Sequence, residues 1–154
     1  MIDPATVPIA ELLPHGPGMA LIDQLLAYDP GKSIGAVLVR RDSRFFDRTG
    51  VPAWVGIEYM AQTIAAHAGF EARLRGKPPS IGFLLGTRSY ECCAIEFPLG
   101  AALEIVVIPL YVEDGLGSFD CTIEHNGVLA RAIVSTYQPK HDEVVNLKGR
   151  REPT

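Results

Sequence analysis

Apolar residues recur along the chain with two periods, one typical of a helix and one typical of strands. Residues 54–74 contain no proline. Within them, apolar side chains recur at the spacing of a buried helical face: Ile57, Ala61, Ile64, Ala65 and Ala68. This is the longest helix that the pattern predicts, and its small residues would let another backbone layer approach closely. Residues 76–79, Gly-Lys-Pro-Pro, are expected to end it.

After this helix the pattern changes to short runs rich in Val, Ile, Phe, Tyr and Thr. Four runs predict strands, over residues 81–93, 103–112, 117–125 and 129–137. Asn126-Gly127 is typical of a tight hairpin turn, because both central residues of such a turn need a positive φ. Pro109 predicts a bulge or an edge position in the second run. We expect the four strands to form an antiparallel meander.

The first third of the chain predicts a short helix over residues 6–13 and strands over residues 19–28 and 33–40, followed by a loop over residues 42–52. One long helix cannot cover both faces of six strands, so the sheet should curl around it and leave its other face for solvent or a partner. This order indicates an α+β hotdog fold, a curled antiparallel sheet wrapped around one long central helix, and suggests a dimer. We expect residues 1–140 to form a single domain and residues 141–154 a polar tail.

Composition narrows the function further. The chain has 154 residues, of which 47% are hydrophobic and 21% charged, as is ordinary for one globular domain. No apolar run approaches the ~20 residues of a membrane span, and the first residues do not resemble a signal peptide, so a cytoplasmic location is expected. The net charge of −4 and the scattered basic residues argue against a nucleic-acid partner. The cysteines Cys92, Cys93 and Cys121 lack metal-ligand spacing and are expected to be reduced core residues, with no metal or cofactor implied.

Two segments carry a resemblance to a known family. Residues 13–23, LPHGPGMALID, resemble the entry segment of the β-hydroxyacyl-acyl-carrier-protein dehydratases, although Gly16 replaces an arginine and Gly18 a proline. Residues 52–62, PAWVGIEYMAQ, resemble the start of the central helix of that family. Residues 45–47 and 54–62 also resemble, more narrowly, the dehydratase-like component of aryl polyene pigment clusters. The resemblance extends from about residue 9 to residue 138.

The resemblance implies a catalytic carboxylate at Glu58. Dehydration of a 3-hydroxyacyl thioester removes a proton from C2 and delivers one to the leaving hydroxyl at C3, and the family uses a carboxylate and a histidine for these steps. An acid that only complements the helix dipole would usually have polar neighbours, whereas Glu58 lies in an apolar run. Gln62 lies one helical turn further on, where it either orients Glu58 or a water, or satisfies backbone groups under the sheet.

The histidine that the family carries fourteen residues before the carboxylate is absent. Arg44 occupies its place, and an arginine stays protonated, so it cannot act as a general base. His15 is the candidate replacement within the chain, with a structural histidine as the equal alternative. His67 is expected at the surface or an interface. His125 and His141 are expected to be solvated.

Two further positions are candidate substrate contacts. Ala53 replaces a family glycine whose backbone N–H meets the thioester carbonyl, and Trp54 is a candidate for the tunnel wall, although an aromatic side chain there is more often core. The implied substrate is an acyl thioester on an acyl carrier protein or coenzyme A, and the implied partner is a second copy or another hotdog chain that supplies the histidine. A hotdog thioesterase and a non-catalytic acyl-binding subunit are the alternatives.

Overall fold

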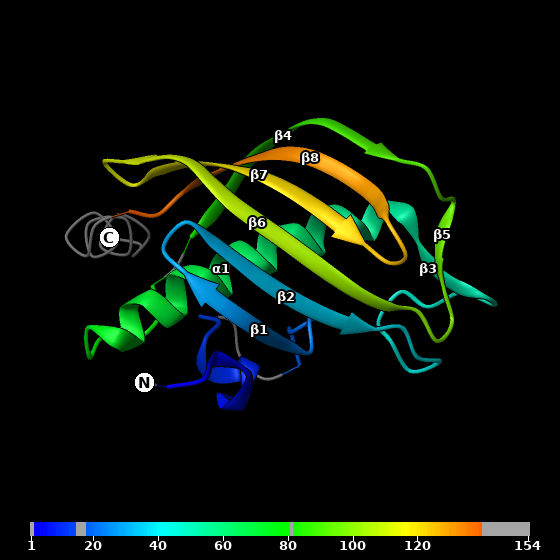
Figure 1. Cartoon of the computed structure of the whole chain (residues 1–154), viewed down its shortest axis with the longest axis horizontal. Coiled ribbons are helices and arrows are strands. Elements are labelled where there is room, and N and C mark those ends of the chain that lie inside the picture. The colour runs from blue at the N-terminus through cyan, green and yellow to red at the C-terminus, as the bar shows by residue number, and fades with distance from the viewer. Residues whose placement is uncertain (1, 15–17, 81, 140–154) are drawn as a thin grey trace, which may run out of the picture.

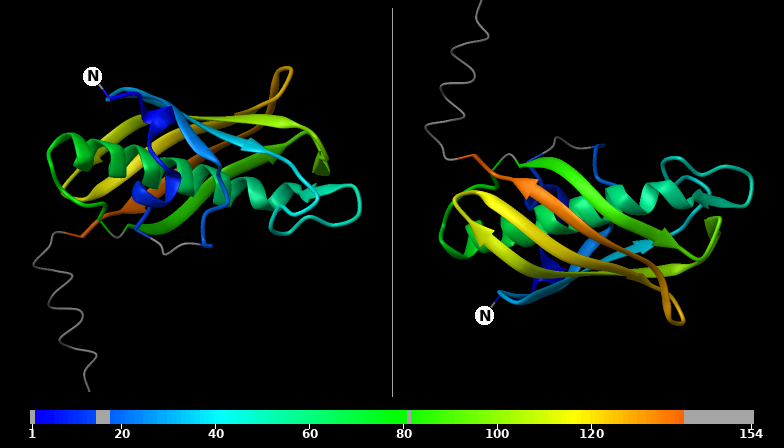
Figure 2. Two further views of the ribbon diagram at one scale, coloured as in Figure 1. Left: turned by 90° about the horizontal axis from the view of Figure 1, so that it is seen from below. Right: turned by 90° about the horizontal axis from the view of Figure 1, so that it is seen from above.

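The computed structural model describes residues 2–14, 18–80 and 82–139. They form a six-stranded antiparallel sheet that curls across one long helix (Figures 1 and 2). The helix is α1 (Gly56–Leu74), preceded by a single 3-10 turn, η3 (Ala53–Val55). The strands are β1 (Gln24–Asp29), β2 (Lys32–Leu38), β3 (Gly50–Pro52), β4 (Phe83–Cys92), β5 (Glu96–Pro98), β6 (Ala102–Glu113), β7 (Leu116–Glu124) and β8 (Val128–Tyr137).

The order of strands across the sheet is β1-β2-β6-β7-β8-β4. Strands β6, β7 and β8 form the predicted meander, but the prediction is wrong for the first of the four runs, because β4 pairs with β8 and not with β6. Between β4 and β6 the chain forms β5, which pairs with β3 just before the helix. This short second sheet carries the chain across the end of the molecule before β6 begins, so β4 becomes an edge strand.

The predicted turn at Asn126-Gly127 is confirmed, and a second turn of the same kind joins the two preceding strands. Asn126 and Gly127 have φ values of 54° and 112°. Asp114 and Gly115, with φ values of 53° and 83°, form the two-residue connection between β6 and β7. The register of β6 against β7 shifts between Pro109 and Tyr111, so the bulge predicted at Pro109 is present.

The helix ends where the sequence predicts. The N–H of Lys77 donates to the carbonyl of Ala72 at 2.9 Å, that of Gly76 donates to the carbonyl of Arg73 at 3.0 Å, and Gly76 has a φ of 71°. This is a Schellman ending, which satisfies the last helical carbonyls and favours glycine.

The buried face of the helix is rotated from the predicted one. Of the five predicted residues only Ile64 is fully buried, whereas Ile57, Ala61, Ala65 and Ala68 are half-buried. Besides Ile64, the helix contributes four residues of the neighbouring stripe to the core: Tyr59, Met60, Thr63 and Phe70. The alanines do not fill the space between helix and sheet, and this leaves a hollow beside them.

Two glycines allow neighbouring layers to approach the helix. A Cβ on Gly35 of β2 would lie 2.5 Å from Oγ1 of Thr63. A Cβ on Gly69 would lie 1.9 Å from the carbonyl oxygen of Leu12, so the N-terminal segment crosses the helix in backbone contact. The blue N-terminal segment is seen lying across the helix in the left view of Figure 2.

The N-terminal elements differ from the prediction. Residues 6–13 do not form one helix; two 3-10 turns, η1 (Pro4–Thr6) and η2 (Ile9–Glu11), are separated around Pro8, which has no N–H to continue the first. Strand β1 begins only at Gln24, because the segment before it is bound by side chains of the helix and loops.

The cysteines are only partly core residues. Cys121 is buried, and burial raises the pKa of its thiol to about 12. Cys92 is half-buried and Cys93 is exposed, because both lie at the end of the edge strand β4. In the described part of the chain, no helix is long and apolar enough to span a membrane.

The contact at Gly69 gives a first prediction. Gly69→Ala should destabilise the protein by about 1–3 kcal/mol, since the new methyl group meets a backbone carbonyl that cannot swing aside, although alanine favours helix intrinsically. Urea unfolding followed by circular dichroism measures the change. Gly86→Ala is the control, because a Cβ on Gly86 meets nothing within 4 Å. Equal stability of the two variants would contradict the close approach.

Candidate functional site

Glu58 lies in the first turn of α1, with an exposed side chain and apolar residues on both sides along the sequence. It faces a hollow of about 240 Å³ between the helix and the β8–β4 edge of the sheet. The wall is mostly apolar: Pro14, Met19, Glu58, Ala61, Gln62, Ile64, Ala65, Ala68, Ser80, Gly82, Leu84, Thr136, Tyr137 and Gln138. The predicted neighbours Glu58 and Gln62 therefore share one cavity wall. The small side chains of α1 create this space.

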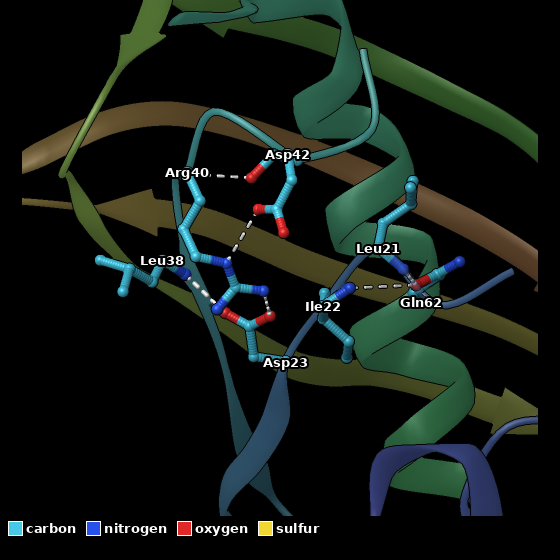
Figure 3. A network of polar contacts seen from close by, with 8 residues as sticks. Leu21, Ile22, Asp23, Leu38, Arg40, Asp42 and Gln62 are labelled. Atoms are coloured by element: carbon cyan, nitrogen blue, oxygen red, sulfur yellow. Dashed lines mark hydrogen bonds and ion pairs between the residues drawn. The ribbon is translucent and has the colours of Figure 1, made fainter. Parts of the chain in front are cut away.

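Gln62 satisfies backbone groups rather than touching Glu58. Its Oε1 accepts hydrogen bonds from the N–H groups of Leu21 at 2.7 Å and Ile22 at 3.3 Å, as Figure 3 shows, and its Nε2 donates to the carbonyl of Met19 at 2.8 Å. Of the two roles predicted for Gln62, the structure favours the second. Gln62 is a positioning residue, because it holds the segment that brings Met19 into the wall of the hollow.

A second set of polar contacts holds the same segment from the other side (Figure 3). Asp23 accepts a hydrogen bond from the N–H of Leu38 at 2.7 Å and pairs with Arg40 at 3.4 Å. Arg40 also pairs with Asp42 at 3.3 Å. Because these ion pairs are exposed to solvent, each contributes little to the free energy of folding. They hold the ends of β1 and β2 next to each other.

Arg44 stands at the position where the sequence resemblance predicts a histidine. Its side chain binds the same entry segment. Its guanidinium donates to the carbonyl of Gly18 and lies 3.9 Å from Sδ of Met19. The loop before α1 is therefore tied to the entry segment by a cation that cannot take up a proton. The sequence did not predict this contact.

The histidines fall into different environments. His15 and His141 lie outside the described residues, although Pro14, next to His15, lines the hollow. The prediction of a surface position for His67 is wrong: it is 5% exposed, because the sheet curls over that side of the helix too. His125 is half-buried, and its Nδ1 lies 3.0 Å from the carbonyl oxygen of Ala102, so it is not simply solvated. Among the described residues, no histidine lines the hollow at Glu58.

Ala53 and Trp54 are not brought to the hollow. The N–H of Ala53, expected to meet a thioester carbonyl, donates to the carbonyl of Ile95 at 3.0 Å, and the hydroxyl of Tyr90 donates to the carbonyl of Ala53 at 2.5 Å. Trp54 is 55% exposed and packs edge-on against Phe45, with 5.2 Å between ring centroids. Both positions lie at the end of the molecule where the short β3–β5 sheet meets the helix.

A second hollow adjoins the first. It has a volume of about 380 Å³ and lies between the later turns of α1 and the β6–β7 hairpin. Ile64, Ala68, Thr136 and Gln138 line both hollows. The two hollows therefore adjoin each other along the helix at Ala68.

Glu58 gives the first hollow a side chain that can take up and release a proton. In the described ranges, no three His, Cys, Asp or Glu residues gather closely enough to hold a metal ion. Burial raises the pKa of Tyr59, which lies beneath the entry segment, to about 12, so this phenol stays protonated at neutral pH. Glu58 is the only acidic side chain in the wall of the first hollow as the structure describes it.

Comparison with solved structures identifies the fold. A chain of the dehydratase heterocomplex ApeI:P from Xenorhabdus doucetiae is 32% identical, with a TM-score of 0.84, over 92% of this chain and 97% of that one. AziG from S. sahachiroi is 15% identical (TM-score 0.58, 76% and 90% of the two chains), and a hypothetical thioesterase with coenzyme A from Streptococcus pneumoniae is 10% identical (0.56, 74% and 86%). The last two share the fold alone. The predicted α+β hotdog fold is confirmed.

The sequence itself gives the family. A search of curated proteins found no match. The family model described as ApeP dehydratase matches residues 7–147, which include Glu58, the entry segment and all the strands. The predicted resemblance to hotdog dehydratases of this kind is thereby confirmed, and the chain belongs to the ApeP-like dehydratase family.

Proposed function

We propose that this chain is one subunit of a heteromeric dehydratase that acts on carrier-bound 3-hydroxyacyl thioesters in polyene synthesis, with Glu58 as its catalytic carboxylate. One observation carries the proposal: a single carboxylate stands at the mouth of an apolar hollow whose described wall contains no histidine. An acyl carrier protein or coenzyme A would present the thioester, and the acyl chain would lie along the small residues of α1.

Dehydration needs two proton transfers at this site. The proton on C2 is removed, the electron pair of that bond forms the C2–C3 double bond, and the C3 hydroxyl leaves as water after it gains a proton. Glu58 handles one of these protons. Arg44 cannot handle the other, and it is already bound to Gly18. The second group is therefore a histidine that comes from a partner chain or, as the alternative, His15.

The edge strand β4 is the proposed contact for that partner. Leu84 of β4 lines the hollow, and Leu84 and Leu85 are 43% and 57% exposed. Strand pairing at this edge would continue the sheet and bring a second hotdog chain beside Glu58. The similar protein from Xenorhabdus doucetiae comes from a complex of two different subunits, which supports a heteromer.

Two other functions are weighed against this one. A thioesterase would use Glu58 to activate water against the thioester, and a similar fold occurs in a hypothetical thioesterase. That likeness shows the fold alone, whereas the family match is to a dehydratase. Product analysis separates the two, because hydrolysis frees the carrier thiol and dehydration does not. A non-catalytic acyl-binding subunit would bind acyl carriers but tolerate the loss of Glu58.

Replacement of Glu58 tests the site directly. Glu58→Gln should lower kcat of the assembled dehydratase by about 10²–10⁴-fold, because the amide keeps the size of the carboxylate but cannot exchange the proton. The melting temperature should not change, since Glu58 is exposed at the hollow. Glu104→Gln, on the exposed face of β6, is the matched control. Full activity of Glu58→Gln would remove Glu58 from the mechanism.

The missing histidine gives a separate prediction. The purified chain alone should dehydrate a 3-hydroxyacyl thioester weakly or not at all, and addition of a hotdog partner that bears a histidine in the corresponding loop should restore turnover. His15→Ala should leave the activity of the mixture unchanged if the partner supplies the histidine, and abolish it if His15 does. Robust activity of the chain alone, undiminished by His15→Ala, would contradict both accounts.

The path along α1 predicts a change in chain-length preference. Ala68→Leu should reduce kcat/KM for long acyl chains by about tenfold or more and spare the shortest ones, because the larger side chain narrows the junction of the two hollows. A series of acyl thioesters of increasing length measures this. Ala102→Leu, an exposed change on β6, is the control. An equal loss at every length would mean that the chain does not pass Ala68.

A further inference from the structure

A buried polar cluster forms part of the wall of the second hollow. His67 of α1 is 5% exposed, and its Nδ1 lies 2.7 Å from Oγ of Ser33 on β2. Its Nε2 lies 3.6 Å from Oε2 of Glu71, one turn further along the helix. The hydroxyl of Tyr28 donates to the same Glu71 oxygen at 2.8 Å. Both His67 and Glu71 line the hollow.

The imidazole of His67, which lines the hollow, has one N–H group that can donate a hydrogen bond. Burial lowers the pKa of His67 more than the nearby carboxylates of Glu71 and Asp29 raise it, so the ring is neutral at pH 7 and has one N–H. A carboxylate only accepts hydrogen bonds, which places the proton on Nε2 toward Glu71 and leaves Nδ1 to accept from Ser33. At 3.6 Å the contact from Nε2 to Glu71 is longer than a hydrogen bond.

The order Ser33, His67, Glu71 is that of a hydrolytic triad, but it cannot work as one. Ser33 is fully buried, with 0% of its surface exposed. Its hydroxyl therefore cannot reach a substrate carbonyl in the hollow. The accessible members of the cluster are His67 and Glu71, which suit binding rather than nucleophilic attack.

The rest of the surrounding wall is apolar and partly aromatic. The ring of His67 packs against Tyr28 and Phe119, with centroids 5.1 and 6.3 Å apart, and Phe119 also lines the hollow. A purely hydrocarbon chain in this space would cover the N–H of His67 without accepting a hydrogen bond from it, which is costly. Glu71 already accepts a hydrogen bond from Tyr28 and pairs with Arg75 at 3.7 Å. A hydroxyl group there would accept from Nε2 of His67 and donate to Glu71.

We propose that the second hollow binds the far end of the acyl chain, and that His67 and Glu71 select chains whose terminal group forms hydrogen bonds, such as a hydroxyl. This proposal deepens the function proposed above and rests on it, because it takes the ligand to be the acyl chain that enters beside Glu58. Nine residues separate Glu58 from His67, a rise of roughly 13 Å along the helix, so the site selects medium-length or longer chains.

Matched substrates test the selection. Two 3-hydroxyacyl thioesters of equal length, one ending in a hydroxyl and one in a methyl group, are compared by kcat/KM in the assembled dehydratase. The hydroxyl-terminated chain is expected to be favoured by about tenfold or more, since a methyl group leaves the N–H of His67 without an acceptor. The double variant Ser33→Ala/His67→Leu should lower this ratio, because it removes both partners of the buried bond together and leaves Glu71 alone to bond the hydroxyl. His125→Leu, remote from both hollows, should leave the ratio unchanged.

A binding measurement keeps this proposal apart from the catalytic one. Glu58→Gln should still bind the hydroxyl-terminated acyl thioester about tenfold more tightly than the methyl-terminated one, as measured by calorimetry, whether or not any variant turns over. Failure of dehydration with this binding preference intact would count against the proposed function alone. Equal binding of the two ligands would overturn the role of His67 and Glu71, and an undiminished preference in the double variant would overturn the role of His67.

Discussion

The structure depends on the way that one helix is enclosed by a single curled sheet and an N-terminal segment. Both layers pack closely against α1. Gly35 of the sheet contacts the side chain of Thr63, and Gly69 of the helix contacts the backbone of Leu12. These contacts leave no room for a side chain, so the enclosing layers are held close at two points. Where α1 carries alanine instead of a larger residue, the same enclosure leaves empty space, and the two hollows follow this stripe of small residues.

Acidic and basic side chains line the two hollows at different points along the helix. Near its start the wall carries the carboxylate of Glu58, and further along it carries His67 with Glu71. Gln62 and Arg44 bind the entry segment from the helix and from the loop, which fixes Met19 in the wall.

Arg44 has a structural contact at the position where the sequence resemblance predicts a histidine. The guanidinium is a permanent donor, and the carbonyl of Gly18 is its acceptor. The family match and the heteromeric relative are consistent with a division of labour between two hotdog chains.

Local patterns in the sequence predict the long helix, the main strands and the turns, and they give Glu58 as the candidate for proton transfer. Helix and strand differ in period, the turns at Asn126-Gly127 and Asp114-Gly115 follow from residues that tolerate a positive φ, and Glu58 was visible as an acid in an apolar run. These features are local, so a local pattern suffices to predict them.

Which side chains come into contact depends on the tertiary structure and is not predicted by the sequence pattern. The pairing of β4 with β8 depends on the crossing made by β5, and the burial of His67 depends on how far the sheet curls around the helix. The role of Gln62 likewise depends on a segment some forty residues earlier in the chain. Contacts between residues so far apart in the sequence depend on how the whole sheet closes over the helix. The periodicity of a single segment does not predict this closure.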